Sequence, residues 1–266
     1  MMSETEPVLL SYPLSDRCYA FSTTRSGGVS EGNYAHFNVS SNCGDSPSHV
    51  AENRRLLCHR LGIDRYRLIV PHQTHGDRLL VLDESFFSQS EADRARALEG
   101  VDALLTAVPR VCIGVSTADC VPVLLYASDG PCVAAIHAGW RGTVRRIVSK
   151  VVDRMLADGV AASHIRAVIG PSISLPAFEV GDEVYEAFMQ AGFPPDVAQR
   201  FPRPDGTSRW HIDLWAANAR LLMEKGIAAQ QIRQAGICTY THSAQFFSAR
   251  KLGTNCGRIF NGIMLR

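Results

Sequence analysis

The sequence predicts an α+β fold in which mixed β-sheets are flanked by helices. Short apolar runs with strand composition occur along the whole chain, and several follow one another across turns of a few residues. Three longer segments with helical features lie between these runs. The order lacks the regular strand–helix alternation of a doubly wound parallel sheet. We therefore expect mixed sheets within a single domain that spans 1–266.

Eight apolar runs are predicted to be strands. Turn residues such as Gly and Asp separate several of them. The predicted strands are 17–23, 78–83, 102–106, 111–117, 121–126, 132–137, 165–170 and 259–265. Because only a short turn sequence separates 121–126 from 132–137, we expect these two strands to pair as a hairpin.

Three segments are predicted to be helices: 46–62, 141–159 and 213–226. The first has Ser46 as its N-cap, Pro47 at the first helical position and Gly62 just past its end. The second repeats apolar residues at helical spacing, which gives it one apolar face. The third has Asp213 as its N-cap and Gly226 as its stop.

Two polar stretches, 89–100 and 193–210, are predicted to be loops. Neither separates two apolar segments that could each form a core, so they do not divide the chain. No internal repeat or low-complexity tract is found.

Composition limits the classes of function. Hydrophobic residues make up 46% and charged residues 20% of the chain, and the net charge is +1. This balance supports an ordinary core but no binding of nucleic acid or of an anionic membrane. No apolar run is long enough to cross a bilayer, and 1–17 lacks the pattern of an export signal. We therefore expect a cytoplasmic protein.

Three short motifs carry residues suited to chemistry: HQTHG (72–76), TADC (117–120) and HAGWRG (137–142). The predicted hairpin would bring Cys120 and His137 face to face, and a histidine of 72–76 would complete a Cys-His-His set. Such a set suits a zinc ion with an open fourth position. It also suits a cysteine nucleophile with a histidine base and no metal. Asp119 either orients a ligand imidazole or caps a turn.

Arginines beside glycines indicate sites for anions. Arg25 lies in TTRSGG (23–28), and Arg141 stands at a glycine-flanked helix start, where the helix dipole favours a phosphate. Arg250 follows two phenylalanines in FFSAR (246–250). Taken one at a time, each of these arginines is better explained as a residue without a ligand, such as a solvated helix charge at Arg141.

The motifs together resemble the YfiH family, which is also called the laccase-domain or multicopper polyphenol oxidoreductase family and the peptidoglycan-editing factor family. The resemblance spans nearly the whole chain. The segments that carry it are FSTTRSGGVSEGNYAHFNVSSNCGD, ENRRLL, HQTHG, VDALLT, TADCVPVLLY, VAAIHAGWRGT, IGPSISLPAFEVGDEV and FFSARKLGTNCGRIFNGIML. It implies a fold similar to that of a bacterial cytotoxic (CNF) deamidase. It also implies a zinc-dependent purine nucleoside phosphorylase, with adenosine deaminase and methylthioadenosine phosphorylase as further activities.

The resemblance assigns roles to individual residues. It implies that the metal ligands are His75, Cys120 and His137, whereas His72 does not match the family's ligand position. The same three residues and Asp119 form the expected catalytic set. The expected contacts to substrate are Arg25, Gln73, Arg141 and Arg250. The chain departs from much of the family at SISLPAF, which has no cysteine after IGP.

The predicted function is phosphorolysis of purine nucleosides, with nucleoside and phosphate as partners and with zinc as cofactor. Copper is the alternative metal, and the protein is expected to be a monomer or a homodimer. The alternative functions are a metal-free Cys-His hydrolase, a peptidoglycan-precursor editing enzyme, a copper-dependent polyphenol oxidase and a binding protein with structural zinc. Multicopper chemistry needs clustered H-x-H pairs, and none of the 9 histidines forms one.

Overall fold

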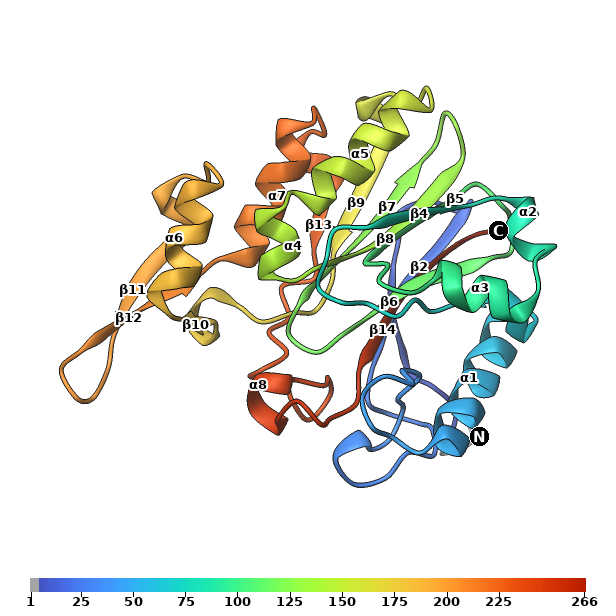
Figure 1. Cartoon of the computed structure of the whole chain (residues 1–266), viewed down its shortest axis with the longest axis horizontal. Coiled ribbons are helices and arrows are strands. Elements are labelled where there is room, and N and C mark those ends of the chain that lie inside the picture. Colours follow the sequence, from blue (N-terminus) through green and yellow to red (C-terminus); the bar gives the residue numbers. More distant parts are fainter. Residues whose placement is uncertain (1–4) are drawn as a thin grey trace.

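The computed structural model describes residues 5–266 and builds them as stacked layers. A six-stranded and a five-stranded sheet lie against each other, and helices cover the outer faces of both (Figure 1). The predicted α+β class with mixed sheets and flanking helices is therefore confirmed. The first four residues, part of the stretch 1–17 considered above, lie outside the described residues.

The six-stranded sheet holds both predicted hairpin strands at its centre. Its order is β13-β9-β7-β8-β5-β4. The strands are β4 (Leu79–Leu82), β5 (Ala103–Thr106), β7 (Val121–Ala127), β8 (Cys132–Ala138), β9 (Ile165–Ile169) and β13 (Ile232–Gln234). β7 and β8 pair antiparallel with Pro122 opposite His137, which confirms the hairpin. β4 pairs with β5, and β13 with β9, in parallel, so the sheet is mixed.

The five-stranded sheet joins the two ends of the chain. Its order is β1-β2-β14-β6-β3, so the last strand lies between two earlier ones. The strands are β1 (Leu9–Tyr12), β2 (Cys18–Thr23), β3 (Leu68–Ile69), β6 (Cys112–Thr117) and β14 (Ile259–Leu265).

The helices are of two kinds. The α-helices are α1 (Pro47–Leu61), α2 (Glu84–Phe87), α3 (Glu91–Ala97), α4 (Trp140–Val144), α5 (Ile147–Ala157), α6 (Asp182–Gln190), α7 (Leu214–Glu224) and α8 (Ala249–Leu252). Short 3₁₀ turns occur at Gly32–Tyr34, Arg65–Arg67, Ala162–His164, Leu175–Ala177, Pro195–Val197 and Ala229–Gln231. No helix within residues 5–266 has the length and apolar character needed to cross a bilayer.

The layers explain why the central strands read as continuous apolar runs. In β7, Val123 and Leu125 belong to the core shared with α5 and α7, whereas Leu124 and Tyr126 belong to the core between the sheets. Successive side chains of a strand point to opposite faces, and here both faces are covered. All residues of β7 and β8 are buried as a result, which fixes the strand ends that carry the site.

Two of the predicted helices form as expected. α1 begins at Pro47 and ends before Gly62, which adopts the left-handed conformation. Ser46 occupies the N-cap position, but its hydroxyl bonds to the Ser48 hydroxyl and does not cap the helix. Asp213 caps α7 through a bond from the backbone N–H of Ala216, at 2.9 Å.

The other long helix is interrupted. The prediction of one helix over 141–159 is wrong, because Arg146 adopts a left-handed conformation with φ of 59° and separates α4 from α5. The break turns the chain so that Ile147 and the apolar residues after it pack against the six-stranded sheet.

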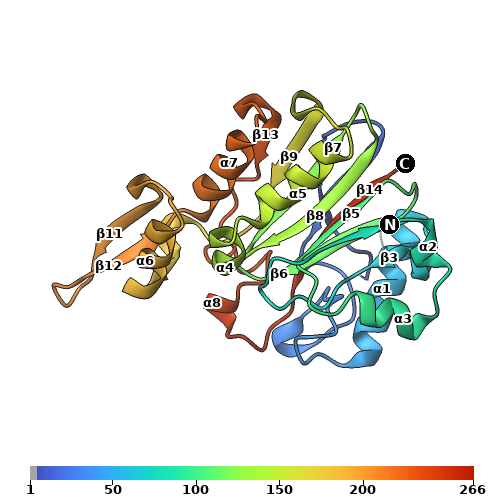
Figure 2. The ribbon, with the colours of Figure 1, turned by 45° about the horizontal axis from the view of Figure 1, so that its top comes forward.

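Both predicted loops contain regular structure. Residues 89–100 include α3, and 193–210 include β11 (Ala198–Pro202) and part of β12 (Ser208–Ile212). These strands join β10 (Glu179–Val180) in a three-stranded sheet that projects from the body together with α6 (Figure 2). All residues of β11 are exposed or half-buried and none is buried, so its sequence lacks the apolar signal of a strand.

Candidate metal centre

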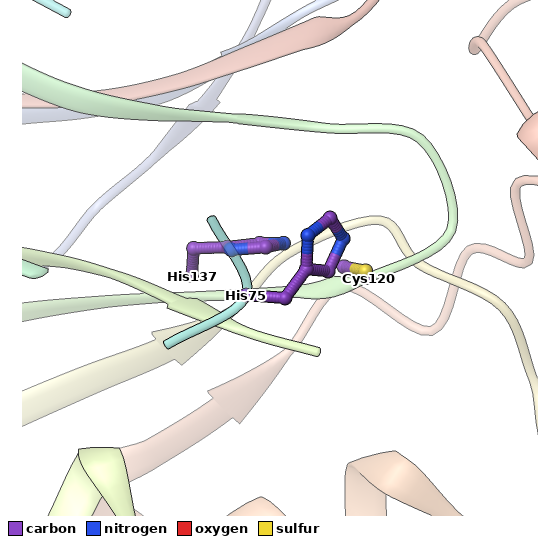
Figure 3. A group of neighbouring side chains, drawn as sticks. All are labelled: His75, Cys120 and His137. Atoms are coloured by element: carbon purple, nitrogen blue, oxygen red, sulfur yellow. The ribbon is translucent and has the colours of Figure 1, made fainter. Parts of the chain in front are cut away.

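His75, Cys120 and His137 come together at the ends of the central strands β7 and β8 of the six-stranded sheet (Figure 3). One ligand atom from each lies within 4.8 Å of the others. His75 comes from the loop before β4, Cys120 directly precedes β7, and His137 lies in β8. His75 is exposed, Cys120 half-buried and His137 buried, so the cluster is open to solvent on the His75 side.

The backbone around the cluster is shaped for close approach. A Cβ atom on Gly139 would lie 3.1 Å from Cys120 Sγ and 3.4 Å from His75 Cδ2, so a larger residue here would press on both side chains. His75 itself has a φ of 59°, an uncommon value for a residue with a side chain. The rings of His75 and His137 meet edge to face, with centroids 4.8 Å apart.

A buried carboxylate, Asp102, holds two of the three candidate ligands. It accepts a hydrogen bond from His137 Nδ1 at 2.7 Å, and its side chain is inaccessible to solvent. It also accepts bonds from the backbone N–H groups of Thr74, His75 and Gly76, at 3.2, 3.1 and 2.8 Å. Asp102 therefore orients His137 so that Nε2 is the atom left for a ligand, and it shapes the loop that carries His75.

The sequence did not single out Asp102. It stands at the start of the predicted strand 102–106, where one acidic residue before an apolar run has no distinctive pattern. Its partners lie 26 to 35 residues away in the chain, so only the fold brings them together.

The charges in the cluster are coupled. Burial favours the neutral thiol of Cys120, but the charge of His137 and hydrogen bonds with His137 and His75 outweigh it and lower the pKa to about 6. Burial likewise favours neutral His137, but the charge of Cys120 and the bond to Asp102 raise its pKa to about 9. Burial opposes ionisation of Asp102 too, yet the hydrogen bond and the charge of His137 keep its pKa below the usual value. The cluster thus favours a thiolate, the form that binds metal.

Asp119 faces away from the imidazoles. Its carboxylate accepts bonds from Thr239 Oγ1 and from the backbone N–H of Arg250, both at 2.7 Å. The expectation that Asp119 orients a ligand imidazole is therefore corrected, since Asp102 occupies that position. Asp119 instead ties the end of β6 to the segment that leads into α8.

Gln73 is bound to a neighbouring strand. Its Nε2 donates to the carbonyl of Ser116 at 2.9 Å, and its Oε1 accepts from the N–H of Ser116 at 2.7 Å. These bonds attach the HQTHG loop to β6. The predicted contact between Gln73 and substrate stays a prediction.

The three arginines differ in how they are held. Arg25 donates from Nε to the carbonyl of Ala35 at 2.9 Å and from Nη1 to that of Ser243 at 2.6 Å. Arg250 donates from Nη2 to the carbonyl of Glu179 at 3.0 Å. Arg141 is exposed, stacks over Trp140 at 4.3 Å and makes no ion pair within residues 5–266. Their contacts to substrate stay predictions.

His72 lies outside the cluster. Its Nδ1 is 2.6 Å from Glu99 Oε1, in an exposed ion pair. All eight cysteines are free, and seven are buried whereas Cys120 is partly accessible.

Comparison with known proteins identifies the family. A model of the family described as "Multi-copper polyphenol oxidoreductase laccase" matches residues 19–266. The chain belongs to this family. The resemblance recognised in the motifs is thereby confirmed.

Relatives with enzyme names cover most of the chain. A protein of Bacteroides thetaiotaomicron named "Purine nucleoside phosphorylase" is 47% identical over 246 residues, covering 92% of this chain and 90% of its own length. "Adenosine deaminase RL5", from an unknown prokaryotic organism, is 44% identical over 245 residues and covers 92% of both chains. The prediction that this chain is an enzyme is confirmed by these relatives.

A solved structure has the same fold. The structure of "Bacillus licheniformis hypothetical protein YfiH" is 28% identical to this chain and superimposes with a TM-score of 0.86. The match covers 100% of this chain and 98% of that one.

Proposed function

We propose that this chain is a zinc-dependent purine nucleoside phosphorylase whose catalytic centre is the His75–Cys120–His137 cluster. The observation that carries the proposal is the 47% identity, over 92% of the chain, to a protein named for that activity. The proposal includes a cytoplasmic location, with a purine nucleoside and phosphate as substrates.

The donor set fits zinc. Two imidazole nitrogens and one thiolate leave a fourth position open in a tetrahedral site, which is the arrangement of catalytic zinc. A bound zinc ion would supply a Lewis acid beside the substrate. The carboxylate of Asp102 behind His137 supports the fit, because imidazole ligands usually donate their second N–H to such a group.

The reaction makes further demands on the protein. Cleaving an N-glycosidic bond builds positive charge on the ribose, so phosphate must be held beside the sugar and the leaving purine must be stabilised. Arg141 suits the phosphate because its guanidinium is exposed and unpaired in the described chain, four residues after His137. Arg25 is the second candidate, although Nε and Nη1 already bind carbonyl groups.

The same site supports a second activity, deamination of adenosine. The observation that favours it is the 44% identity to the protein named adenosine deaminase. Deamination would need a water at the open metal position and a place beside it for the adenine ring.

The test combines metal analysis with two assays on the purified chain. We expect about one zinc per chain. We also expect release of purine base from adenosine and inosine that requires phosphate. Base release that proceeds equally without phosphate would contradict phosphorolysis. Conversion of adenosine to inosine, followed separately, tests the deaminase.

A metal-free hydrolase is the rival, and the geometry gives it one argument. Cys120, His137 and Asp102 form a thiol–imidazole–carboxylate series like that of cysteine hydrolases. The two mechanisms differ in the state of Cys120. A zinc-bound thiolate resists alkylation until the metal is removed, whereas a free nucleophile reacts at once.

Iodoacetamide labelling mapped by mass spectrometry separates them. With zinc present we expect Cys120 to be spared, and a strong chelator should expose it and abolish nucleoside cleavage. In the stripped protein, a pKa of about 6 leaves Cys120 ionised at pH 7, so labelling should be fast there and slow as the pH falls below about 6. Fast labelling of metal-replete protein, with activity indifferent to chelator, would favour the hydrolase.

The number of ligand clusters argues against multicopper oxidation. Within residues 5–266, His75, Cys120 and His137 are the one group of three or more His, Cys, Asp or Glu side chains placed to hold a metal ion. A multicopper centre needs several such groups. Copper in this single site is the alternative that metal analysis tests.

A further inference from the structure

A cavity of about 810 Å³ lies away from the metal centre. It is formed by α1, the 3₁₀ turn Arg65–Arg67, β3 and α3. α1 and α3 lie side by side in both Figure 1 and Figure 2. None of His75, Cys120 and His137 lines it. Its volume falls within the range of pockets that bind small molecules, about 300–1,000 Å³.

Three arginines line this cavity without carboxylate partners. Arg54, Arg65 and Arg94 form no ion pair within residues 5–266. The Nε of Arg94 is buried and has no hydrogen-bond partner there. A buried donor left unpaired is costly, and a bound group that reached this atom and accepted its hydrogen would remove that cost.

The arginines also act on one another. Arg54 is half-buried, with Nε bonded to the carbonyl of Val39 at 2.8 Å. Burial, and then the charge of Arg65, lower the pKa of Arg54. An anion between these guanidinium groups would relieve their repulsion.

The carboxylates on the cavity wall do not neutralise these arginines by direct contact. Glu99 pairs with His72 at 2.6 Å. Asp64 precedes the turn Arg65–Arg67 and Glu91 lies in the first turn of α3, and neither forms an ion pair within residues 5–266.

Part of the remaining wall is apolar, beside the polar Ser41 and Asn42. Leu68, Ile69, Phe86 and Leu98 line it, and Tyr66 beside them is 48% exposed. A large exposed aromatic side chain at the edge of an apolar cavity is suited to cover a flat hydrophobic group. The cavity thus combines cationic donors with an apolar surface.

We propose that this cavity is a second binding site, which takes an organic anion. Its phosphate, sulfonate or carboxylate group is held by Arg54, Arg65 and Arg94, and its apolar or aromatic body lies against Tyr66, Phe86 and Leu98. Two sources share this chemistry: a mononucleotide and an acyl or aryl carboxylate.

Fluorescence titration with 8-anilinonaphthalene-1-sulfonate, an aromatic sulfonate, tests the site on the full chain. We expect saturable binding that weakens as salt is added. Arg94→Gln should raise the dissociation constant at least about tenfold, since a charge-assisted hydrogen bond is lost. This variant should fold normally, because Arg94 Nε has no partner to lose within the described residues. Competition with AMP and with decanoate then separates the two sources.

The matched control is Arg96→Gln. Arg96 is two residues away on α3, but it does not line the cavity and pairs with Asp93. Its variant should bind the dye like the unmodified protein, and both variants should keep full activity on nucleosides. Dye binding that is unchanged in Arg94→Gln, or weakened equally in both variants, would overturn the proposal. Arg65→Gln provides a second variant on another element, the 3₁₀ turn Arg65–Arg67, with the same expected loss.

Discussion

Two buried carboxylates, Asp102 and Asp119, lie near the cluster and hold different parts of it. Asp102 binds the ligand side: one imidazole and three successive backbone N–H groups. Asp119 binds the opposite side: the hydroxyl of Thr239 and the backbone N–H of Arg250. A single carboxylate, that of Asp102, thus holds the side of the cluster with His137 and the His75 loop. The carboxylate of Asp119 ties the other side to the segment that carries Arg250.

The two sets of hydrogen bonds indicate which carboxylate can be replaced by an amide without loss of bonds. Around Asp102 every hydrogen bond comes from an N–H group, so the carboxylate must accept all of them. Around Asp119 one donor is a hydroxyl, which can reverse its role. The ligand side should therefore respond more strongly to a change of one atom.

The largest effect is expected from removal of a ligand. His75→Ala, Cys120→Ala and His137→Ala should each lose the metal and lower the rate of nucleoside cleavage by more than about a hundredfold. This exceeds the roughly 10- to 100-fold loss that follows when a residue behind a metal ligand is changed. Elemental analysis and the base-release assay measure both.

His72→Ala is the matched control for this set. His72 is three residues from His75 but pairs with Glu99 on the surface. Its variant should keep metal and activity. If His72→Ala lost the metal while His75→Ala retained it, the ligand assignment would be wrong.

The next effect separates the two carboxylates directly. Asp102→Asn should weaken metal binding by about 10- to 100-fold, because the new NH₂ group must face an N–H donor. Asp119→Asn should change it little, since its amide can donate to Thr239 and still accept from Arg250. Metal affinity measured by competition with a chelator checks the pair. Equal losses in both variants would remove the distinction drawn here.

A smaller effect is expected from crowding the ligand side. In Gly139→Ala the new Cβ would lie 3.1 Å from Cys120 Sγ, so the thiolate must shift. Metal affinity should fall by about tenfold, at the lower end of the roughly 10- to 100-fold cost of changing a residue that positions a metal ligand. Gly130→Ala is the control, because there the Cβ would meet only Val160, at 3.4 Å. A variant at 139 that binds metal normally would show that the cluster adapts.

The smallest effect concerns the predicted anion contacts. Arg141→Ala, at an exposed side chain, and Arg25→Ala, at a half-buried one, should raise the KM for phosphate roughly three- to tenfold without loss of metal, because single charged contacts contribute modestly. Lysine should restore little where the forked guanidinium is used. Unchanged phosphate kinetics in both variants would return these arginines to the surface-charge interpretation.

Local signals were sufficient for the elements whose chemistry is visible in the chain. The cap at Asp213 and the stop at Gly62 are set by adjacent residues, and the hairpin of β7 and β8 follows from two apolar runs and a short turn. The break at Arg146 was missed, because a left-handed residue other than glycine leaves no trace in composition.

The sequence predicts the three candidate ligands but not the carboxylate behind them, for a similar reason. His75, Cys120 and His137 belong to recognisable motifs, so the sequence brings them to attention. Asp102 acts through bonds to groups distant in the chain, and three of these are backbone N–H groups that any residue supplies. The role of orienting a ligand imidazole therefore depends on contacts that only the fold creates. The sequence instead points to Asp119 for this role, because Asp119 is next to Cys120 in the chain.

The unequal burial of the three ligands has a consequence for the exchange of metal with solvent. His137 lies in β8, whose residues are all buried, and Cys120 directly precedes the equally buried β7, so both are attached to strands that open with the core. His75 is exposed and lies in a short loop. Opening of that loop detaches one ligand while the other two stay in place. We therefore expect a bound metal to leave through a local motion of the loop that carries His75, at a rate that depends less on the stability of the whole fold.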